Sequence, residues 1–159
     1  MRLVFALVVL IAFVTPQGSQ PIRVTGSGFD GAIIRGIDRR PSDGRNSKSC
    51  CDWTPTEDQV RQAEALLPAY LGSAEAARLL HNTRIRSHLQ GYKRQYWGQT
   101  RGKLRQIQIH FYHQNSNVVT TGTWLKTAVA VNGGGDHYFQ VTYDVDNRRF
   151  VNLWVNAPE

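Results

Sequence analysis

Residues 91–113 read GYKRQYWGQTRGKLRQIQIHFYH, and this stretch decides the fold. Its second half alternates: Ile107, Ile109 and Phe111 point one way, while the polar residues between them point the other. Two alternating arms, residues 89–99 and 104–112, flank a turn sequence at 100–103 that contains a glycine. We therefore expect a β-hairpin whose apolar side faces a core.

Three further strands are expected after this hairpin. Residues 124–131 predict a third strand, and residues 138–145 predict a fourth, with Phe139, Val141 and Tyr143 on one face. Between and after them, NGGGD at 132–136 and DNRR at 146–149 are turn sequences, and residues 150–155 return as a fifth strand. The pattern favours a curved antiparallel meander of four to five strands.

Helical signals precede the hairpin. In Thr54-Pro55-Thr56-Glu57, Thr54 is expected as the N-cap, with proline at the first helical position and Glu57 three residues after the cap. Pro68 is expected to kink or end this helix, and a second, short helix over residues 73–80 is expected to start from a Ser73 cap. The buried stripe of the first helix is read from Val60, Ala63, Leu67 and Tyr70.

The order of helix, helix and hairpin-connected strands predicts the α+β class, with a long helix and a short helix packed on the meander. We expect one α+β domain over residues 53–159, which is enough chain to bury a core. Within the helices, Glu57 is interpreted as a capping residue and Glu64 as part of a solvated face.

The N-terminus has the layout of a secretory signal peptide. A positive start is followed by the apolar run LVFALVVLIAFV at residues 3–14 and then by small and polar residues. This run is short for a membrane span of roughly 20 residues. We expect a signal peptide over residues 1–19, export to the periplasm, the cell surface or the medium, and no membrane span after cleavage.

Residues 20–52 are rich in Gly, Ser, Arg and Asp, and they predict a flexible arm, with a strand near residues 29–35 as the alternative. Cys50 and Cys51 lie in this arm and are the only cysteines of the chain. A bridge between neighbours closes a strained ring, so free or intermolecularly paired thiols are expected, with a disulfide-linked homodimer as one outcome.

Several short motifs give the chain a resemblance to known proteins. They are W-x-P at 53–55, Y-x-R-Q-Y-x-G at 92–98, G-G-x-x-Y-F-x-V-x-Y-D at 134–144 and N-L-x-x-N at 152–156. The combination resembles small exported bacterial proteins of unassigned function, and the arrangement is similar to the helix-in-sheet fold of the cystatin and NTF2 type. The Q-x-V-x-G loop and the Pro-Trp loop of protease-inhibiting cystatins are missing, so the resemblance implies neither protease inhibition nor any site residue.

Charge is biased along the middle of the chain. Residues 76–135 contain no Asp or Glu but nine Lys or Arg. Aromatic residues alternate with cations on the first arm of the hairpin, a pattern that can stack bases beside phosphate-binding groups. The competing interpretation is structural, because strand aromatics usually fill a core and cations often protect edges and turns. The candidate binding residues for an anionic polymer are Arg94, Arg101, Lys103, Arg105 and His110.

Catalytic signals are sparse. His110 could be approached across the sheet by Asp144 or Asp146, and His137 follows Asp136 directly, so a general base oriented by a carboxylate is an alternative for either histidine. Hydrolase, metalloprotease and phosphate-loop motifs are missing, and neither a cofactor nor a metal site is expected.

Two classes of function follow from the sequence. The first is an exported, non-catalytic binding module that presents Gln106, Gln108, His110, Gln140 and Thr142 on the polar face of its sheet, or engages an anionic polymer through its basic hairpin. Another exported protein, or a second copy through the sheet, is the alternative partner. The second class is a small nuclease-like hydrolase that uses His110 or His137 with Asp144 or another aspartate.

Overall fold

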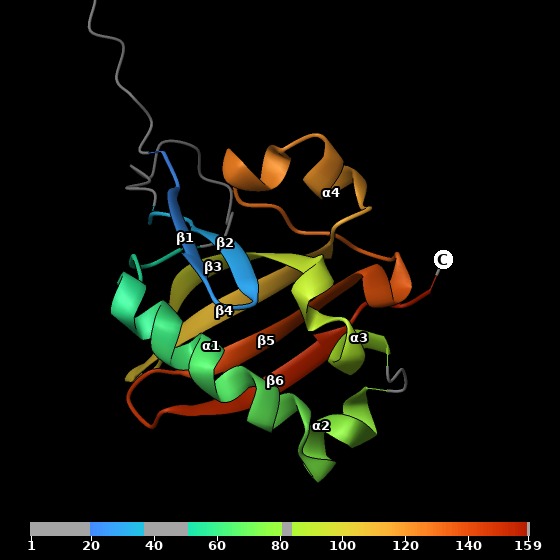
Figure 1. Cartoon of the computed structure of the whole chain (residues 1–159). Coiled ribbons are helices and arrows are strands. Elements are labelled where there is room, and N and C mark those ends of the chain that lie inside the picture. Colours follow the sequence, from blue (N-terminus) through green and yellow to red (C-terminus); the bar gives the residue numbers. More distant parts are fainter. Residues whose placement is uncertain (1–19, 37–50, 81–83, 159) are drawn as a thin grey trace, which may run out of the picture.

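The computed structural model describes residues 20–36, 51–80 and 84–158. In these residues one sheet is formed by β1 (Ile22–Gly26), β2 (Phe29–Ile33), β3 (Tyr92–Arg101), β4 (Leu104–His113), β5 (Tyr138–Asp144) and β6 (Arg149–Val155). The helices are α1 (Glu57–Leu71), α2 (Ala74–Leu79), α3 (Arg84–Ser87) and α4 (Asn117–Thr120), with short 3-10 turns η1 (Leu89–Gly91), η2 (Thr123–Leu125) and η3 (Gly135–His137). The fold is α+β (Figure 1), as predicted.

The sheet has six strands and is mixed, which corrects the expectation of four to five antiparallel strands. Its strands follow chain order from β1 to β6, and every neighbouring pair is antiparallel except β2 and β3. The helical segment from α1 to η1 makes the long crossover that a parallel pair requires. The expected helices are therefore the crossover between β2 and β3 and not the start of the fold.

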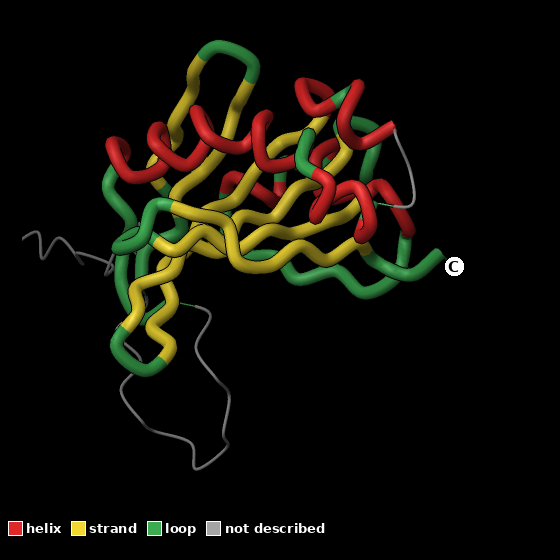
Figure 2. The backbone as a smooth tube through the Cα atoms, turned by 90° about the horizontal axis from the view of Figure 1, so that it is seen from below, coloured by secondary structure: helices red, strands yellow, loops and turns green. Residues whose placement is uncertain are grey.

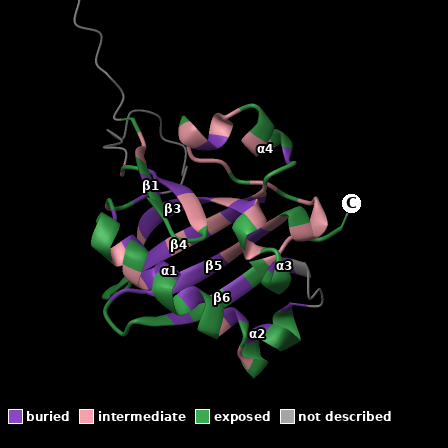
Figure 3. Ribbon diagram, in the orientation of Figure 1, coloured by how far each residue is buried: buried purple, intermediate pink, exposed green. Residues whose placement is uncertain are grey.

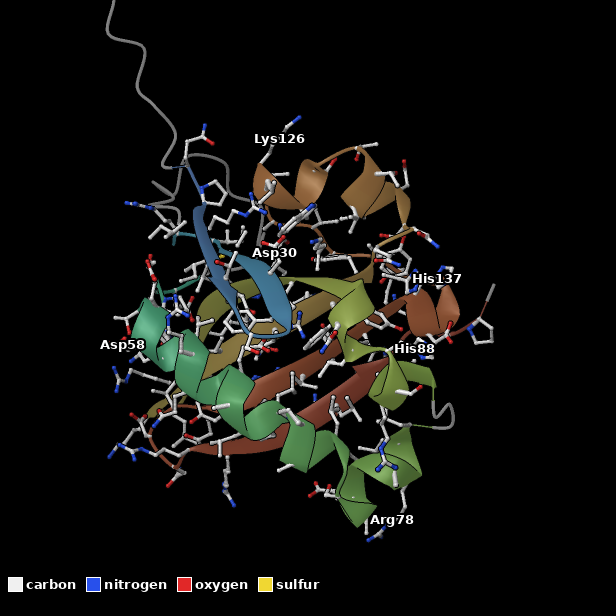
Figure 4. All side chains as sticks on the ribbon, in the orientation of Figure 1. Asp30, Asp58, Arg78, His88, Lys126 and His137 are labelled. Carbon is white, nitrogen blue, oxygen red and sulfur yellow. The ribbon has the colours of Figure 1, made fainter. Side chains whose placement is uncertain are left out.

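Residues 22–33 form a hairpin at the edge of the sheet, so this part of residues 20–52 is not the predicted flexible arm, and the alternative of a strand near residues 29–35 is found as β2. Gly28 has φ +82°, so the turn uses backbone that glycine adopts easily. The carboxylate of Asp30, labelled in Figure 4, accepts hydrogen bonds from Arg23 on β1 and Lys93 on β3. The sparse apolar residues are sufficient because β3 supplies a hydrogen-bonding edge and the core receives Val24 and Ile33. The signal peptide predicted over residues 1–19 lies outside the described residues.

Helix α1 starts two residues later than predicted. Thr56, not Thr54, is the N-cap: its hydroxyl accepts from the Gln59 amide at 3.3 Å, and the Gln59 side chain accepts from the Thr56 amide at 3.0 Å. Thr54 instead accepts a hydrogen bond from the Gly36 amide at 3.1 Å. Glu57 lies in the first turn, where the helix dipole favours a carboxylate. Pro68 does not end the helix, which continues to Leu71.

The short helix and the central hairpin are confirmed. The Ser73 hydroxyl caps α2 by accepting from the Ala76 amide at 3.2 Å. Strands β3 and β4 pair from Tyr92 opposite His113 to Arg101 opposite Leu104. Ile107, Ile109 and Phe111 are all buried on the core side. The two last strands also form where the alternation placed them, at β5 and β6.

Residues 124–131 do not form the predicted strand. The segment that contains α4 and η2 instead packs over the second face of the sheet, where Trp124 joins Ala32 and Tyr112 in a separate apolar cluster. The buried amide of Gln95 donates to the carbonyls of Trp124 and Thr127 and accepts from the Val129 amide. These bonds give three backbone groups of the segment a partner without a neighbouring strand. The apolar residues that suggested a strand pack against the sheet instead.

The molecule has a helix layer on one face of the sheet. Helix α1 runs across this face in Figure 1 and appears as a layer alongside the strands in Figure 2. The main core lies between the helices and the sheet, and it contains Val60, Leu67, Tyr96, Ile109 and Val141. Figure 3 shows the central strands largely buried. Trp53 packs directly on Gly98, where any Cβ would collide with the indole.

Cys51 is part of a disulfide, which corrects the expectation of free thiols. It is buried beside Ile34 and Trp97. Cys50, the other cysteine of the chain, lies outside the described residues. Of the helices in the described ranges, none has the length and apolarity needed to cross a membrane.

Candidate functional site

The residues predicted to bind an anionic polymer lie in three separate places. Arg101, Lys103 and Arg105 flank the β3–β4 turn, while Arg94 lies near the other end of β3, about 23 Å away along the strand. His110 lies on β4, and its ring packs on the second face of the sheet. The five residues therefore do not form one surface.

The β3–β4 and β5–β6 turns point to the same end of the sheet, at the lower left of Figure 1. They are adjacent because Gln106 on β4 pairs with Asp144 on β5, and the Val145 amide donates to the Arg105 carbonyl at 3.0 Å. Arg148 and Arg149 of the second turn thus join the three cations of the first. We call these five exposed residues the basic end: Arg101, Lys103, Arg105, Arg148 and Arg149.

Carboxylates lie near two members of the basic end, and one of the two forms an ion pair. The Arg105 guanidinium forms an ion pair with Asp146 at 2.8 Å, and it lies 5.9 Å from the ring of Trp53. Arg149 pairs across the strands with the buried Asp144. Arg101, Lys103 and Arg148 form no ion pair with any described residue. These three cations also have no carboxylate opposite them in the strand register, so their charge is the most available to a ligand.

Arg94 is buried, which corrects its expected place in a binding surface. Its Nε lies 3.1 Å from Glu64 Oε1, an ion-pair contact whose angle is poor for a hydrogen bond. The hydroxyl of Tyr96 donates to the same carboxylate oxygen at 2.8 Å. Glu64 is likewise buried, which corrects its interpretation as a solvated residue. Burial raises the pKa of Glu64 and outweighs Arg94 and the Tyr96 hydroxyl, which both lower it.

His110 does not supply a cation. Its ring stacks on Trp97 with centroids 4.0 Å apart, and burial lowers its pKa to about 3. The imidazole is therefore neutral at any ordinary pH. This environment corrects the expectation that His110 binds an anionic polymer, and it also leaves the ring too weakly basic to serve as a general base near neutrality.

The predicted pairing of a histidine with Asp144 does not form. On β5, His110 lies opposite Gln140, four residues or about 13 Å from Asp144. Asp144 instead accepts hydrogen bonds from the amides of Asp146 and Asn147 and from the Asn147 side chain, so it stabilises the β5–β6 turn. His137, labelled in Figure 4, stacks on His113 with centroids 4.9 Å apart. Of the three candidate catalytic residues, Asp144 therefore stabilises a turn, and His110 and His137 each stack on another aromatic ring.

The polar face of the sheet is less open than expected. Gln106 and Thr142 are buried, and the Thr142 hydroxyl donates to Gln108 at 2.9 Å. Sequence reasoning missed Trp154, which pairs with Gln140 and keeps 59% of its surface exposed. A signal was present, because alternation along β6 places Trp154 on the same face as the polar Asn152 and Asn156, opposite the buried Leu153.

A cleft beside α1 was also missed. It has a volume of about 970 Å³ and lies between the β1–β2 turn, α1 and the segment from α3 to β3. Its walls include Glu64, Arg86, His88 and Arg94. Among the described residues, no group of three or more His, Cys, Asp or Glu side chains could hold a metal ion.

Comparison of the chain with protein-family models, with curated protein sequences and with solved structures finds no match in any of the three.

Proposed function

We propose that this protein is an exported, non-catalytic binding module that engages anionic polymers through the basic end. The observation that carries the proposal is the meeting of two hairpin turns, which gathers five cations from separate parts of the sequence. Arg101, Lys103 and Arg148 form no ion pair with any described residue, so their charge is available to a ligand. Export is proposed from the apolar run at residues 3–14, and we also propose that the fold is of the cystatin and NTF2 helix-in-sheet type.

The backbone at Arg148 supports a role for this side chain. Arg148 has φ +51° and is the only described residue other than glycine in the left-handed region. This conformation costs an L-residue about 1 kcal/mol or more, which glycine avoids. Strain of this kind often accompanies a functional requirement at the same position. An arginine kept where glycine would be easier is consistent with selection for its charge.

The two turns together also supply the two kinds of cation that bind phosphate or sulfate groups. Guanidinium groups bind such anions through paired hydrogen bonds, and Lys103 adds a point charge. The exposed ring of Trp154 lies near the other end of β6, so it does not belong to this surface. Affinity should therefore be electrostatic and nearly independent of polymer sequence.

The test compares two double variants with the same change of charge. Arg101→Gln with Lys103→Gln removes one arginine and one lysine from the basic end, whereas Arg78→Gln with Lys126→Gln removes the same pair elsewhere, at the positions labelled in Figure 4. Retention on immobilised heparin should fall clearly for the first variant and only slightly for the second. Equal losses would show that net charge, not the basic end, governs binding.

Trp154 supports a second candidate function, contact with a protein partner through the exposed part of the sheet. Exposed tryptophan is enriched at protein interfaces, where it fills a pocket of the partner. A second copy of the chain is the partner that can be tested with the purified protein alone. Sedimentation of the unaltered protein and of Trp154→Ser at equal concentration tests this, since loss of a dimer in the variant supports the sheet interface and two monomers rule it out.

A further inference from the structure

The cleft beside α1 contains a buried carboxylate with one oxygen left for a ligand. Glu64 Oε1 receives the Tyr96 hydroxyl and faces Arg94. Glu64 Oε2 accepts no hydrogen bond from a described residue and is not among the fully enclosed polar atoms that lack a partner. The side chain is only 6% exposed, and the residue lines the cleft. The free oxygen therefore faces the cleft from its floor.

Arg94 holds this carboxylate in place but is not available to a ligand. Its guanidinium donates to the carbonyls of Tyr92, Gly28 and Leu89, and only 1% of the side chain is exposed. These bonds fix the β1–β2 turn and η1 as the two walls of the cleft. Because Arg94 neutralises Glu64, the floor presents a hydrogen-bond acceptor without a net negative charge.

Two further arginines, Arg61 and Arg86, line the cleft besides Arg94. Arg86 on α3 lines the cleft and forms no ion pair with a described residue. Arg61 on α1 also lines the cleft, but it donates to the Thr25 carbonyl at 2.9 Å and contacts Glu57. Arg86 is therefore the cation with charge to offer to a ligand.

We propose that this cleft binds a small hydroxylated anion, with its carboxylate or phosphate on Arg86 and a hydroxyl group donated to Glu64 Oε2. A volume of about 970 Å³ accommodates a molecule of one or two sugar rings. The two protein side chains call for these two ligand groups. A buried carboxylate can accept a hydrogen bond from a neutral hydroxyl, and a guanidinium binds a carboxylate or phosphate. This site is independent of the basic end, which lies at the other end of the sheet.

The test uses four probes that separate the two contacts. Glucuronate and glucose 6-phosphate carry both groups, whereas glucose has only hydroxyls and acetate has only the charge. Amide chemical shifts of the full chain should respond to the first two probes at residues 26–28, 64–65 and 89–91. Glucose and acetate should bind at least about tenfold more weakly, because each lacks one charge-assisted hydrogen bond.

Three variants and a control assign the site. Arg86→Gln should weaken glucuronate binding about tenfold or more by removing the charge. Glu64→Gln should also weaken it, because the hydroxyl loses a charge-assisted hydrogen bond and keeps at most a neutral one to the amide. Ala65→Trp fills the cleft from the exposed face of α1 without touching this pair. Ala69→Trp adds the same bulk to α1 outside the cleft and should leave binding unchanged.

Thermal unfolding of each variant shows whether it is folded, so Ala65→Trp keeps the test valid if Glu64→Gln does not fold. The proposal is overturned if no probe shifts the cleft amides at about 10 mM, which would nearly saturate a site with a Kd of about 1 mM. It is also overturned if glucose or acetate binds as tightly as glucuronate, or if Ala65→Trp binds normally. If the unaltered protein is not retained on heparin but still binds the probes in the cleft, the proposed function alone is rejected.

Discussion

Arg94 on β3 and Glu64 on α1 meet inside the protein, with Arg94 Nε 3.1 Å from Glu64 Oε1 and with 1% and 6% of their side chains exposed. The arginine also donates to the carbonyls of Gly28 and Leu89, so one side chain links the edge hairpin, the helix and the start of the central hairpin. The ring of Phe111 lies 5.3 Å from its guanidinium. This relationship determines both the packing of α1 and the shape of the cleft.

Removing one partner of this pair should destabilise the fold strongly. Arg94→Met leaves a buried carboxylate without its cation and should cost about 3–5 kcal/mol in the free energy of unfolding. Arg94→Met combined with Glu64→Leu should recover a large part of this loss, because no uncompensated charge remains. Urea denaturation of the three proteins measures the coupling. Additive losses would mean that the two side chains act independently.

Both residues gave a sequence signal that could have been used. Glu64 is four residues after Val60 and three before Leu67, so it lies on the apolar stripe of the helix. Arg94 alternates with Tyr92 and Tyr96, which places it on the core face of β3. Neither position alone predicts burial, since charged residues are rarely enclosed without a partner. Their pairing joins residues 30 positions apart, and only the packing of α1 on β3 reveals it.

The helix cap predicts a second, smaller effect. Thr56→Ala removes the hydroxyl that accepts the Gln59 amide and should cost about 1 kcal/mol, whereas Thr56→Ser keeps an acceptor and should cost little. Thermal unfolding at a fixed pH compares the two. If Thr56→Ala matches Thr56→Ser, the hydroxyl does not stabilise the start of α1.

The edge hairpin should be part of the cooperative fold. Ile33 on β2 is fully buried, so Ile33→Ala should cost about 2–5 kcal/mol through lost contacts and a cavity. Arg23→Ala changes an exposed residue of the same hairpin and should cost less than about 1 kcal/mol. Equilibrium unfolding measures both. Similar small losses would indicate that residues 22–33 contribute little to the stability of the domain.

How far the sequence predicts this fold depends on the range of the interactions. Alternation was sufficient for β4, whose Ile107, Ile109 and Phe111 form an apolar face, and the glycine-containing turn then predicts β3 as its hairpin partner. β2 has only five residues and includes Gly31 and Ala32, so its pattern is weak, and it becomes ordered by parallel pairing with β3. The segment at 124–131 shows the opposite case. Its apolar pattern predicted a strand, but its apolar residues pack on the sheet without strand pairing. The sequence singled out Arg101, Lys103 and Arg105 of the basic end. It could not single out residues 148 and 149, because only the register of the sheet brings them beside the first turn.

Asp144 should make stability depend on pH in a defined direction. Hydrogen bonding from the Asn147 side chain lowers the pKa of this carboxyl below its ordinary value of 3.8, despite the opposing effect of burial. A lowered pKa in the folded state stabilises the protein above the unfolded pKa, and the contribution is lost as pH falls through the folded pKa. Asp144→Asn should therefore cost about 1–2 kcal/mol at neutral pH, with the difference from the unaltered protein shrinking below pH 3.8. A difference that stays constant down to acid unfolding would mean that the charge is unimportant.

The most direct test of the binding account is the salt dependence of heparin affinity, measured for the unaltered protein and for a variant with Arg101, Lys103 and Arg148 all changed to Gln. Each phosphate or sulfate contact that is lost should reduce the slope of log Kd against log salt concentration by about one unit or slightly less. If the basic end is the binding surface, the variant should bind more weakly at low salt with a slope smaller by two to three such units, while its unfolding transition stays unchanged. An unchanged slope in a folded variant would contradict the account.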